Sequence, residues 1–161
     1  IMTELADALS QLAATRAELH ALINSCEPEA LERKGAVGDW SAKNVLAHLA
    51  AWEAWVVEAL PERMRTGATP AHLRERLADE ERFNAEEIAE REELTVDEQI
   101  IELERYRDEL LAWLATLDQA AVSRPQPWGT WLGTLPEYLI EALRDHEAEH
   151  IAALRAAFLA G

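Results

Sequence analysis

The chain has a single cysteine, Cys26, among its 161 residues. One thiol cannot form an intramolecular disulfide, and it cannot supply the several thiolates of a cysteine-rich zinc site. Cys26 falls where the first helix is expected to end, and we interpret it as a packed thiol. Disulfide scaffolds and zinc-finger folds are therefore excluded.

Glycine and proline are also scarce, at six residues each, whereas Ala, Leu, Glu and Arg are abundant. This composition is typical of an all-helical protein and argues against a sheet fold or a disordered chain. No run approaches the roughly 18 consecutive apolar residues of a transmembrane helix. The first turns carry acidic side chains, where a signal peptide has a basic start. We therefore expect a cytoplasmic protein.

Positive charge is the third shortage. The sequence has 31 acidic against 15 basic side chains, which gives a formal net charge of −16. The acidic residues are spread along the predicted helices, and such a surface repels both the phosphates of nucleic acid and an anionic membrane. We therefore expect no nucleic-acid partner and no membrane partner.

Apolar residues at three- and four-residue steps, together with N-cap signals, predict helices over residues 3–25, 42–65, 70–92, 95–117 and 134–159. The third segment is crowded with charge and is expected to lie outside the bundle. In the first helix, Arg16 and Glu18 are expected to point toward solvent. The prediction is one all-α domain over residues 1–161, a four-helix bundle with an additional peripheral charged helix.

Residues 118–133 form the one long segment that is predicted to be irregular. It holds two prolines, two glycines and two tryptophans, Trp128 and Trp131. A loop of this length and aromatic content is either a binding loop or lid, or a hydrophobic flap that covers one end of the core. The sequence does not decide between the two.

Two of the five histidines, His146 and His150, lie four residues apart on the apolar stripe of the last predicted helix. Buried imidazoles need hydrogen-bond partners or a metal, and this spacing places both rings within reach of one ion. His48, at the edge of the apolar sector of the second long helix, adds a third inward donor. Three histidines suit Zn²⁺ or Ni²⁺ and leave a fourth position for water. A surface or interface pair is the alternative, and we interpret His20 and His72 as surface histidines.

Three segments carry a resemblance to a known family: WSAKNVLAHLAAWE (Trp40–Glu53), RFNAEEI (Arg82–Ile88) and DHEAEHIAALR (Asp145–Arg155). In these segments the chain resembles the DinB/YfiT-like superfamily, and within it the DfsB/ClbS-like branch. The resemblance implies a DinB-like four-helix bundle of unusual connectivity, often a homodimer, with a divalent metal held by three histidines. Matched residue by residue, the metal ligands fall on His48, His146 and His150.

The functions of the superfamily vary. Some members resemble thiol-dependent transferases or isomerases that use mycothiol or bacillithiol, and ClbS-like members protect cells from a reactive genotoxin. We therefore predict a metal-dependent transferase or hydrolase that acts on a small hydrophobic or electrophilic compound, with Zn²⁺ or Ni²⁺ and a low-molecular-weight thiol cosubstrate. The alternatives are a non-catalytic protein that binds and sequesters such a compound, and a scaffold whose apolar stripes serve dimerisation.

The expected pocket is aromatic. Trp52 and Trp55 from the second long helix, with Trp128 and Trp131 from the 118–133 segment, are expected to wall an apolar site beside the metal. Core packing is the alternative interpretation of Trp52. Asn84 matches a recurring position of the resembled branch and is expected to line the same pocket. Its role there is left open, as is the identity of any general base.

Overall fold

The computed structural model describes residues 2–159, and they are mostly helical. The elements are α1 (Met2–Asn24), α2 (Pro28–Glu32), α3 (Ala42–Thr66), α4 (Ala71–Leu77), α5 (Glu80–Glu90), α6 (Val96–Leu114), α7 (Gln119–Ser123), β1 (Gln126–Trp128), β2 (Trp131–Gly133), α8 (Leu135–Leu139), a π-helical segment η1 (Ile140–Asp145) and α9 (His146–Leu159). The fold is the expected all-α bundle, to which a two-stranded hairpin is added.

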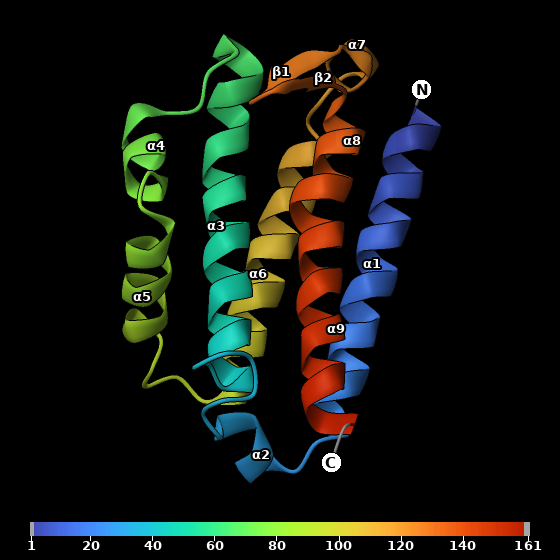
Figure 1. Ribbon diagram of the computed structural model, residues 1–161. Helices are drawn as coiled ribbons and strands as arrows, with labels where there is room; N and C mark the ends of the chain where they lie inside the picture. The colour runs from blue at the N-terminus through green and yellow to red at the C-terminus, as the bar shows by residue number, and fades with distance from the viewer. Residues whose placement is uncertain (1, 160–161) are drawn as a thin grey trace.

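Four long rods make up the bundle: α1, α3, α6 and the continuous helix formed by α8, η1 and α9 (Figure 1). In this view α1 and α8–α9 run downward side by side, whereas α3 and α6 both run upward. Two parallel neighbours need a crossover connection, and α4 and α5 supply it by running back down the outside of α3. This crossover gives the bundle its unusual connectivity.

Three of the predicted helix starts are confirmed by their caps. The Ser41 hydroxyl accepts a hydrogen bond from the Asn44 backbone N–H, and Thr95 and Thr134 open α6 and α8 in the same way. Each of these starts is a capping box, in which the third helical residue bonds back to the cap residue. The caps fix where α3, α6 and α8 begin, and α3 and α8–α9 carry the candidate site.

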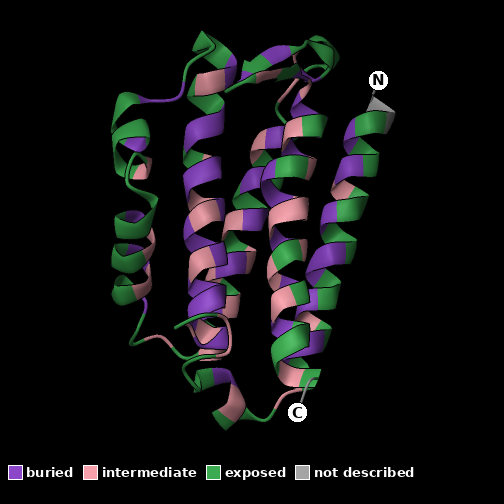
Figure 2. Ribbon diagram, in the orientation of Figure 1, coloured by how far each residue is buried: buried purple, intermediate pink, exposed green. Residues whose placement is uncertain are grey.

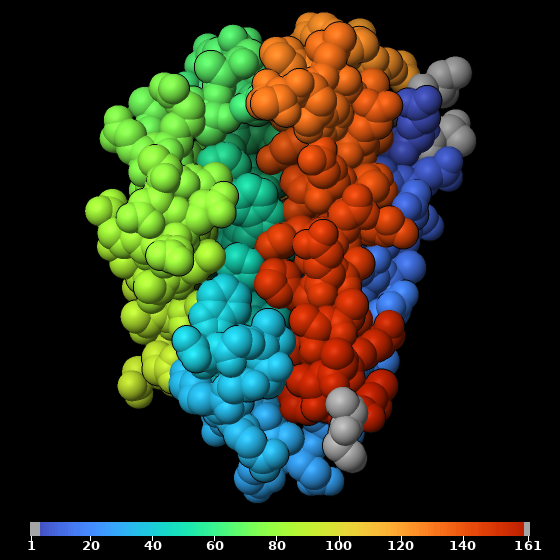
Figure 3. Space-filling view, viewed as in Figure 1, coloured from blue at the N-terminus to red at the C-terminus, as the bar shows by residue number. Residues whose placement is uncertain are grey.

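The charged segment 70–92 was predicted as one helix, and this is wrong: it is two helices, α4 and α5. The break occurs because Asp79 is extended and its side chain accepts from the Arg82 N–H, which starts a new helix. The segment lies outside the bundle as expected, held against α3 by the buried side chains of Leu73 and Phe83. Figure 3 shows that the surface is hollowed between α4–α5 and α8–α9, with α3 as the floor.

The segment 118–133 is not irregular, which corrects a second expectation. It contains α7 and the antiparallel pair β1–β2, in which Trp128 lies opposite Trp131 across a two-residue turn. Gly129 opens that turn with φ +68°, a conformation that glycine adopts without strain. Trp128 is buried and stacks on Tyr138, so the hairpin closes one end of the core.

The buried residues are spread along all four rods (Figure 2), and their apolar side chains form two clusters. We name them by what they adjoin. The hairpin-side cluster includes Leu12, Val56, Leu110, Leu143 and Trp128. The α2-side cluster includes Leu19, Leu49, Leu103, Ile151 and Leu31. Between the two clusters each rod contributes one buried charged residue.

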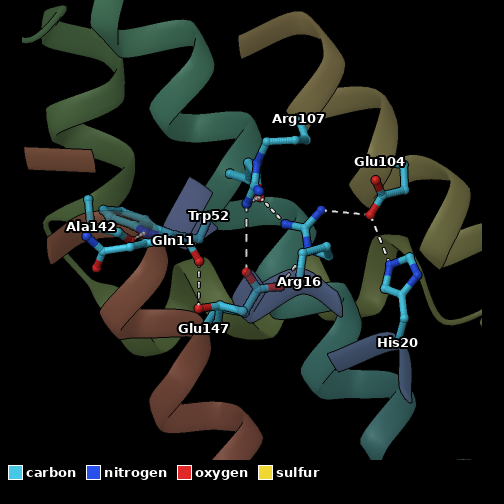
Figure 4. Close-up of polar contacts among 10 residues, drawn as sticks. Gln11, Arg16, His20, Trp52, Glu104, Arg107, Ala142 and Glu147 are labelled. Atoms are coloured by element: carbon cyan, nitrogen blue, oxygen red, sulfur yellow. Dashed lines mark hydrogen bonds and ion pairs between the residues drawn. The ribbon is translucent and has the colours of Figure 1, made fainter. Parts of the chain in front are cut away.

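This charge layer consists of Arg16, Glu53, Arg107 and Glu147, whose exposed fractions are 6%, 3%, 7% and 3%. Arg16 donates to Glu147 and to Glu53, both at 2.6 Å, and Arg107 donates to Glu53 at 2.5 Å (Figure 4 shows the surroundings of Arg16). The expectation that Arg16 points toward solvent is therefore wrong. It is buried because two carboxylates neutralise it inside the bundle.

Candidate metal centre and its cavity

The hollow on α3 is a cavity of about 660 Å³. Its floor is α3, one wall is α8–η1–α9, the other wall is α4–α5, and the hairpin closes one end (Figure 3). The structure brings all the predicted pocket residues to it: His48, Trp52, Trp55, Asn84, Trp128, Trp131 and His146 line it. These residues come from four separate parts of the chain, which only the folded bundle brings together.

Three histidines meet beside this cavity; His48 and His146 line it, and His150 lies outside the lining. His48 comes from α3, and His146 and His150 lie one turn apart on α9; one ring nitrogen of each lies within 4.8 Å of the other two. The His48 and His146 Nε2 atoms are 3.0 Å apart. The three pairs of ring centroids are separated by 5.0, 4.8 and 4.8 Å, so the rings form a nearly equilateral triangle.

A divalent metal fits this triangle. Nitrogens that bind zinc lie about 2.0–2.1 Å from the ion, which places the centroids of three tetrahedrally arranged imidazoles about 5 Å apart. The observed centroid distances have that size. Among the described residues the group contains no Cys, Asp or Glu besides these histidines. The donor set is therefore purely imidazole, which suits zinc, nickel and related ions.

Asn84 of α5 fixes the orientation of the His48 ring. Its Oδ1 lies 3.0 Å from His48 Nδ1. Because an amide oxygen only accepts, the ring carries its proton on Nδ1 and turns an unprotonated Nε2 toward the other two histidines. Metal-binding histidines commonly have such a partner on the second nitrogen. The role left open for Asn84 in the sequence is therefore to orient His48.

Burial keeps the three imidazoles neutral. It lowers the pKa of His48 to about 4 and that of His146 to about 3, with a further lowering from the neighbouring histidines. Burial lowers the pKa of His150 as well, although Glu149 opposes this. Only a neutral imidazole has a lone pair to give to a metal. At neutral pH all three rings are in the metal-binding form.

The comparison with known families agrees with this geometry. The family model of the DinB superfamily matches residues 11–154. The chain belongs to the DinB superfamily. The superfamily typically consists of metal-binding helical proteins, and the histidine cluster of this member can hold a metal.

A solved structure shares the DinB fold of this chain. It is the crystal structure of an uncharacterised protein from Escherichia coli UTI89, to which the chain is similar with a TM-score of 0.70 and 16% sequence identity. The match covers 94% of this chain and 90% of the other. No curated protein matches the chain. Within the described residues of this DinB chain, no helix is both long and apolar enough to cross a bilayer.

The DinB bundle has a π-helical segment directly before His146. At the end of this segment the His146 backbone N–H donates to the Leu143 carbonyl. The Ala142 carbonyl, four residues before His146, accepts a hydrogen bond from the Trp52 indole N–H at 2.6 Å (Figure 4). Trp52 therefore supports the turn that precedes a cluster histidine, as well as lining the cavity. The sequence gives no signal of this segment, because a π-turn has no distinct apolar period.

The cavity walls are more aromatic than predicted. Trp52 and Trp55 stack with their centroids 5.1 Å apart, and Phe83 and Tyr138 join the predicted tryptophans in the lining. The place of Phe83 can be predicted from the sequence, because Phe83 directly precedes Asn84 in the RFNAEEI segment. The place of Tyr138 cannot, because it depends on how the hairpin folds.

The other two histidines lie apart from the cluster. His72 is exposed, with its Nε2 2.8 Å from a Glu58 oxygen, as expected of a surface histidine. His20 is partly exposed and lies 3.0 Å from Glu104, beside the charge layer. Both were predicted as surface residues, and neither approaches the cavity lining.

Proposed function

We propose that this protein is a divalent-metal-dependent enzyme of the DfsB/ClbS-like branch. It transfers a thiol to, or hydrolyses, a small hydrophobic or electrophilic compound. His48, His146 and His150 are the proposed metal ligands, with Zn²⁺ or Ni²⁺ as the metal and a low-molecular-weight thiol as the cosubstrate of the transferase reaction.

One observation supports this proposal: three neutral imidazoles converge beside an aromatic cavity, and two of them, His48 and His146, line it. A three-histidine set leaves a coordination position for water or a substrate, as catalytic sites require. A structural site closes that position with a fourth side chain, and among the described residues the group contains no fourth donor of the His, Cys, Asp or Glu type. The arrangement therefore supports chemistry more than bracing of the fold.

The residues of the chain have distinct tasks in this proposal. His48, His146 and His150 would hold the divalent ion, which would supply Lewis-acid chemistry by lowering the pKa of a water or thiol to give a nucleophile at neutral pH. Asn84 keeps His48 Nε2 free of a proton and turned toward His146. The tryptophan walls exclude water and hold the apolar part of the substrate beside the cluster.

Metal content is the first test. The protein is purified without an affinity-nickel step, dialysed against zinc and analysed by elemental mass spectrometry, as wild type and as His48→Ala, His146→Ala and His150→Ala. We expect near-stoichiometric metal in the wild type and loss of most of it in each variant. His72→Ala is the matched control, because His72 is exposed and outside the cluster. A wild type that stays metal-free would overturn the proposal.

Turnover then separates an enzyme from a binding protein. Metal-loaded protein is incubated with a chromogenic aryl halide plus a thiol, and separately with an activated ester, before and after chelation. Catalysis that chelation abolishes supports the enzyme. Stoichiometric binding of an apolar electrophile without turnover supports a non-catalytic, ClbS-like protective protein, a function that the aromatic cavity also suits.

We also propose a cytoplasmic homodimer. The strongly acidic chain with its single cysteine suits a reducing compartment, and α6 exposes the large apolar side chains Ile101 and Leu111. Analytical ultracentrifugation measures the mass in solution, and a monomer at micromolar concentration would contradict the dimer.

A further inference from the structure

Carboxylates dominate the charged residues of the cavity lining. Four line it, namely Glu80, Glu141, Asp145 and Glu149. Asp145 is paired with Arg144 at 2.7 Å, whereas the other three form no ion pair with any described residue. Glu80, Glu141 and Glu149 are exposed, so they face the solvent that fills the opening of the cavity.

Arg63 is the only Arg or Lys among the described residues that line the cavity, and it is already engaged. One terminal nitrogen donates to Thr69 Oγ1 and the other to the Pro127 carbonyl, both at 2.5 Å. Its guanidinium lies over the Trp128 ring, 4.9 Å from the centroid, and its Nε is buried. Arg63 therefore ties the hairpin to α3, and both of its terminal nitrogens are engaged. Its Nε–H has no hydrogen-bond partner among the described residues, but it is buried.

Glu80 and Glu141 stand on opposite walls of the cavity. Glu80 is four residues before Asn84 on α5, and Glu141 is five residues before His146, which places each about one helical turn from the histidine level, on the hairpin side. The floor at that height is the stacked pair Trp52 and Trp55. Two carboxylates thus flank a pair of aromatic rings.

This combination is the chemistry that recognises a cation. Aromatic rings attract positive charge through their faces. Carboxylates in a cleft with low-dielectric walls add a focused negative potential, and the net charge of −16 reinforces it. The same field repels anionic ligands, and the one Arg or Lys among the described residues of the lining, Arg63, is already bonded to Thr69 and to the hairpin.

We propose that the ligand of this cavity is an organic cation with an apolar body, whose positive group lies between Glu80 and Glu141 over the Trp52–Trp55 pair. This inference rests on the proposed function only in taking the cavity as the ligand site. It narrows the substrate to positively charged compounds and disfavours polyanionic ones, including a thiol cosubstrate that carries several carboxylates.

The test compares three ligands that share one apolar body: phenylbutyltrimethylammonium, phenylbutanol and phenylbutyrate. A quaternary ammonium has no lone pair to give to a metal, so its binding reports on the walls alone. Affinities are measured by calorimetry, with tryptophan fluorescence as a second readout, on zinc-loaded and on chelated protein. We expect the ammonium to bind at least about tenfold more tightly than the other two.

The preference is then assigned to named residues. Glu80→Gln combined with Glu141→Gln is expected to remove most of the preference and leave phenylbutanol binding unchanged. Glu62→Gln with Glu75→Gln removes the same charge from exposed positions outside the lining, and is expected to leave the preference intact. Of the three ligands, only the ammonium should lose binding affinity when the salt concentration is raised.

Two results would overturn the inference: phenylbutanol or phenylbutyrate binding as tightly as the ammonium in chelated protein, or no binding of the ammonium at millimolar concentration. Because the comparison is made with and without zinc, it is independent of the metal analysis. If the protein holds no metal but prefers the ammonium, the proposed metal-dependent enzyme is wrong and the cation inference stands. If the protein holds metal but shows no preference for the ammonium, the cation inference is wrong and the proposed enzyme stands.

Discussion

Asn84 and His48 belong to different helices, α5 and α3, and one hydrogen bond of 3.0 Å joins them. That bond decides which ring nitrogen of His48 faces the cluster. Asn84 is partly buried on the crossover arm, which otherwise consists largely of charged surface. A peripheral element thus supplies a positioning residue for the candidate metal centre.

Replacing Asn84 by Ala is expected to weaken metal binding by about 10- to 100-fold, because the His48 ring loses the partner that fixes its tautomer. Asn84→Asp retains an acceptor and should bind metal at least as well as the Ala variant. The affinities are measured by competition with a chromogenic chelator. Asn24→Ala, at an exposed position, is the control. Equal affinities of Asn84→Ala and the wild type would contradict the assigned role.

The neutrality of His146 predicts acid sensitivity of the metal-free protein. Burial, together with His150 and His48, lowers its pKa in the folded state to about 3, below the ordinary 6.5. The unfolded chain therefore takes up the proton first as pH falls. The stability that this group contributes is complete above pH 6.5 and is lost as pH falls toward about 3.

The loss amounts to at most about 1.4 kcal/mol per pH unit for one such group. Urea unfolding of chelated protein at pH 7 and pH 5 measures it. The wild type should lose more unfolding free energy on acidification than His146→Gln, whereas His72→Ala should behave like the wild type. Equal pH dependence of the wild type and His146→Gln would show that His146 is not held neutral by burial.

At the scale of elements, the sequence predicts a helix and its buried face where apolar residues recur over several turns. The stripes of α1, α3, α6 and α9 are long enough to show which face is buried, and this is how His48 and the pair on α9 could be placed together. The hairpin escapes this reasoning because its strands have only three residues each and Pro127 interrupts one of them. Its shape depends on Gly133, where a Cβ would collide with the Trp131 ring and with the Glu137 carboxylate.

The charge layer could not be predicted from the sequence for a different reason. Arg16 lies four residues after Leu12 and three before Leu19, so it occupies a core position of its stripe. A long basic side chain on a helix usually points into solvent, and this general rule led to the wrong prediction for Arg16. Only the arrival of Glu53 and Glu147 from two other helices makes its burial tolerable, and such pairing is not visible in one helix alone.

At the scale of the whole molecule, the layer joins four helices through a few strong bonds. Burial alone would lower the pKa of Arg16, but the charges of Glu53 and Glu147 outweigh that effect and raise it above its usual range. Arg16 therefore stays charged, and its positive charge offsets the cost of burying the Glu53 and Glu147 carboxylates.

Arg16→Met is accordingly expected to lower the free energy of unfolding by about 3–5 kcal/mol, because buried Glu147 loses its hydrogen-bond donor and buried Glu53 keeps only Arg107. Denaturant unfolding monitored by circular dichroism measures the change. Arg105→Met is the matched control, since Arg105 is exposed, forms an ion pair with Glu109 one turn along α6 and lies over the Tyr106 ring; it should shift stability by less than about 0.5 kcal/mol. An Arg16→Met variant as stable as this control would contradict the account.

The same four charges also determine the register of the bundle. In each rod the charged residue lies between an apolar residue of the hairpin-side cluster and one of the α2-side cluster. If one helix slid by a single turn, about 5.4 Å, its charge would enter an apolar cluster without a partner. Apolar stripes alone tolerate such a slip, because one leucine replaces another. Since Glu147 directly follows His146, holding the charges level also holds α9 level with His48, and the histidine triangle keeps its height in the bundle.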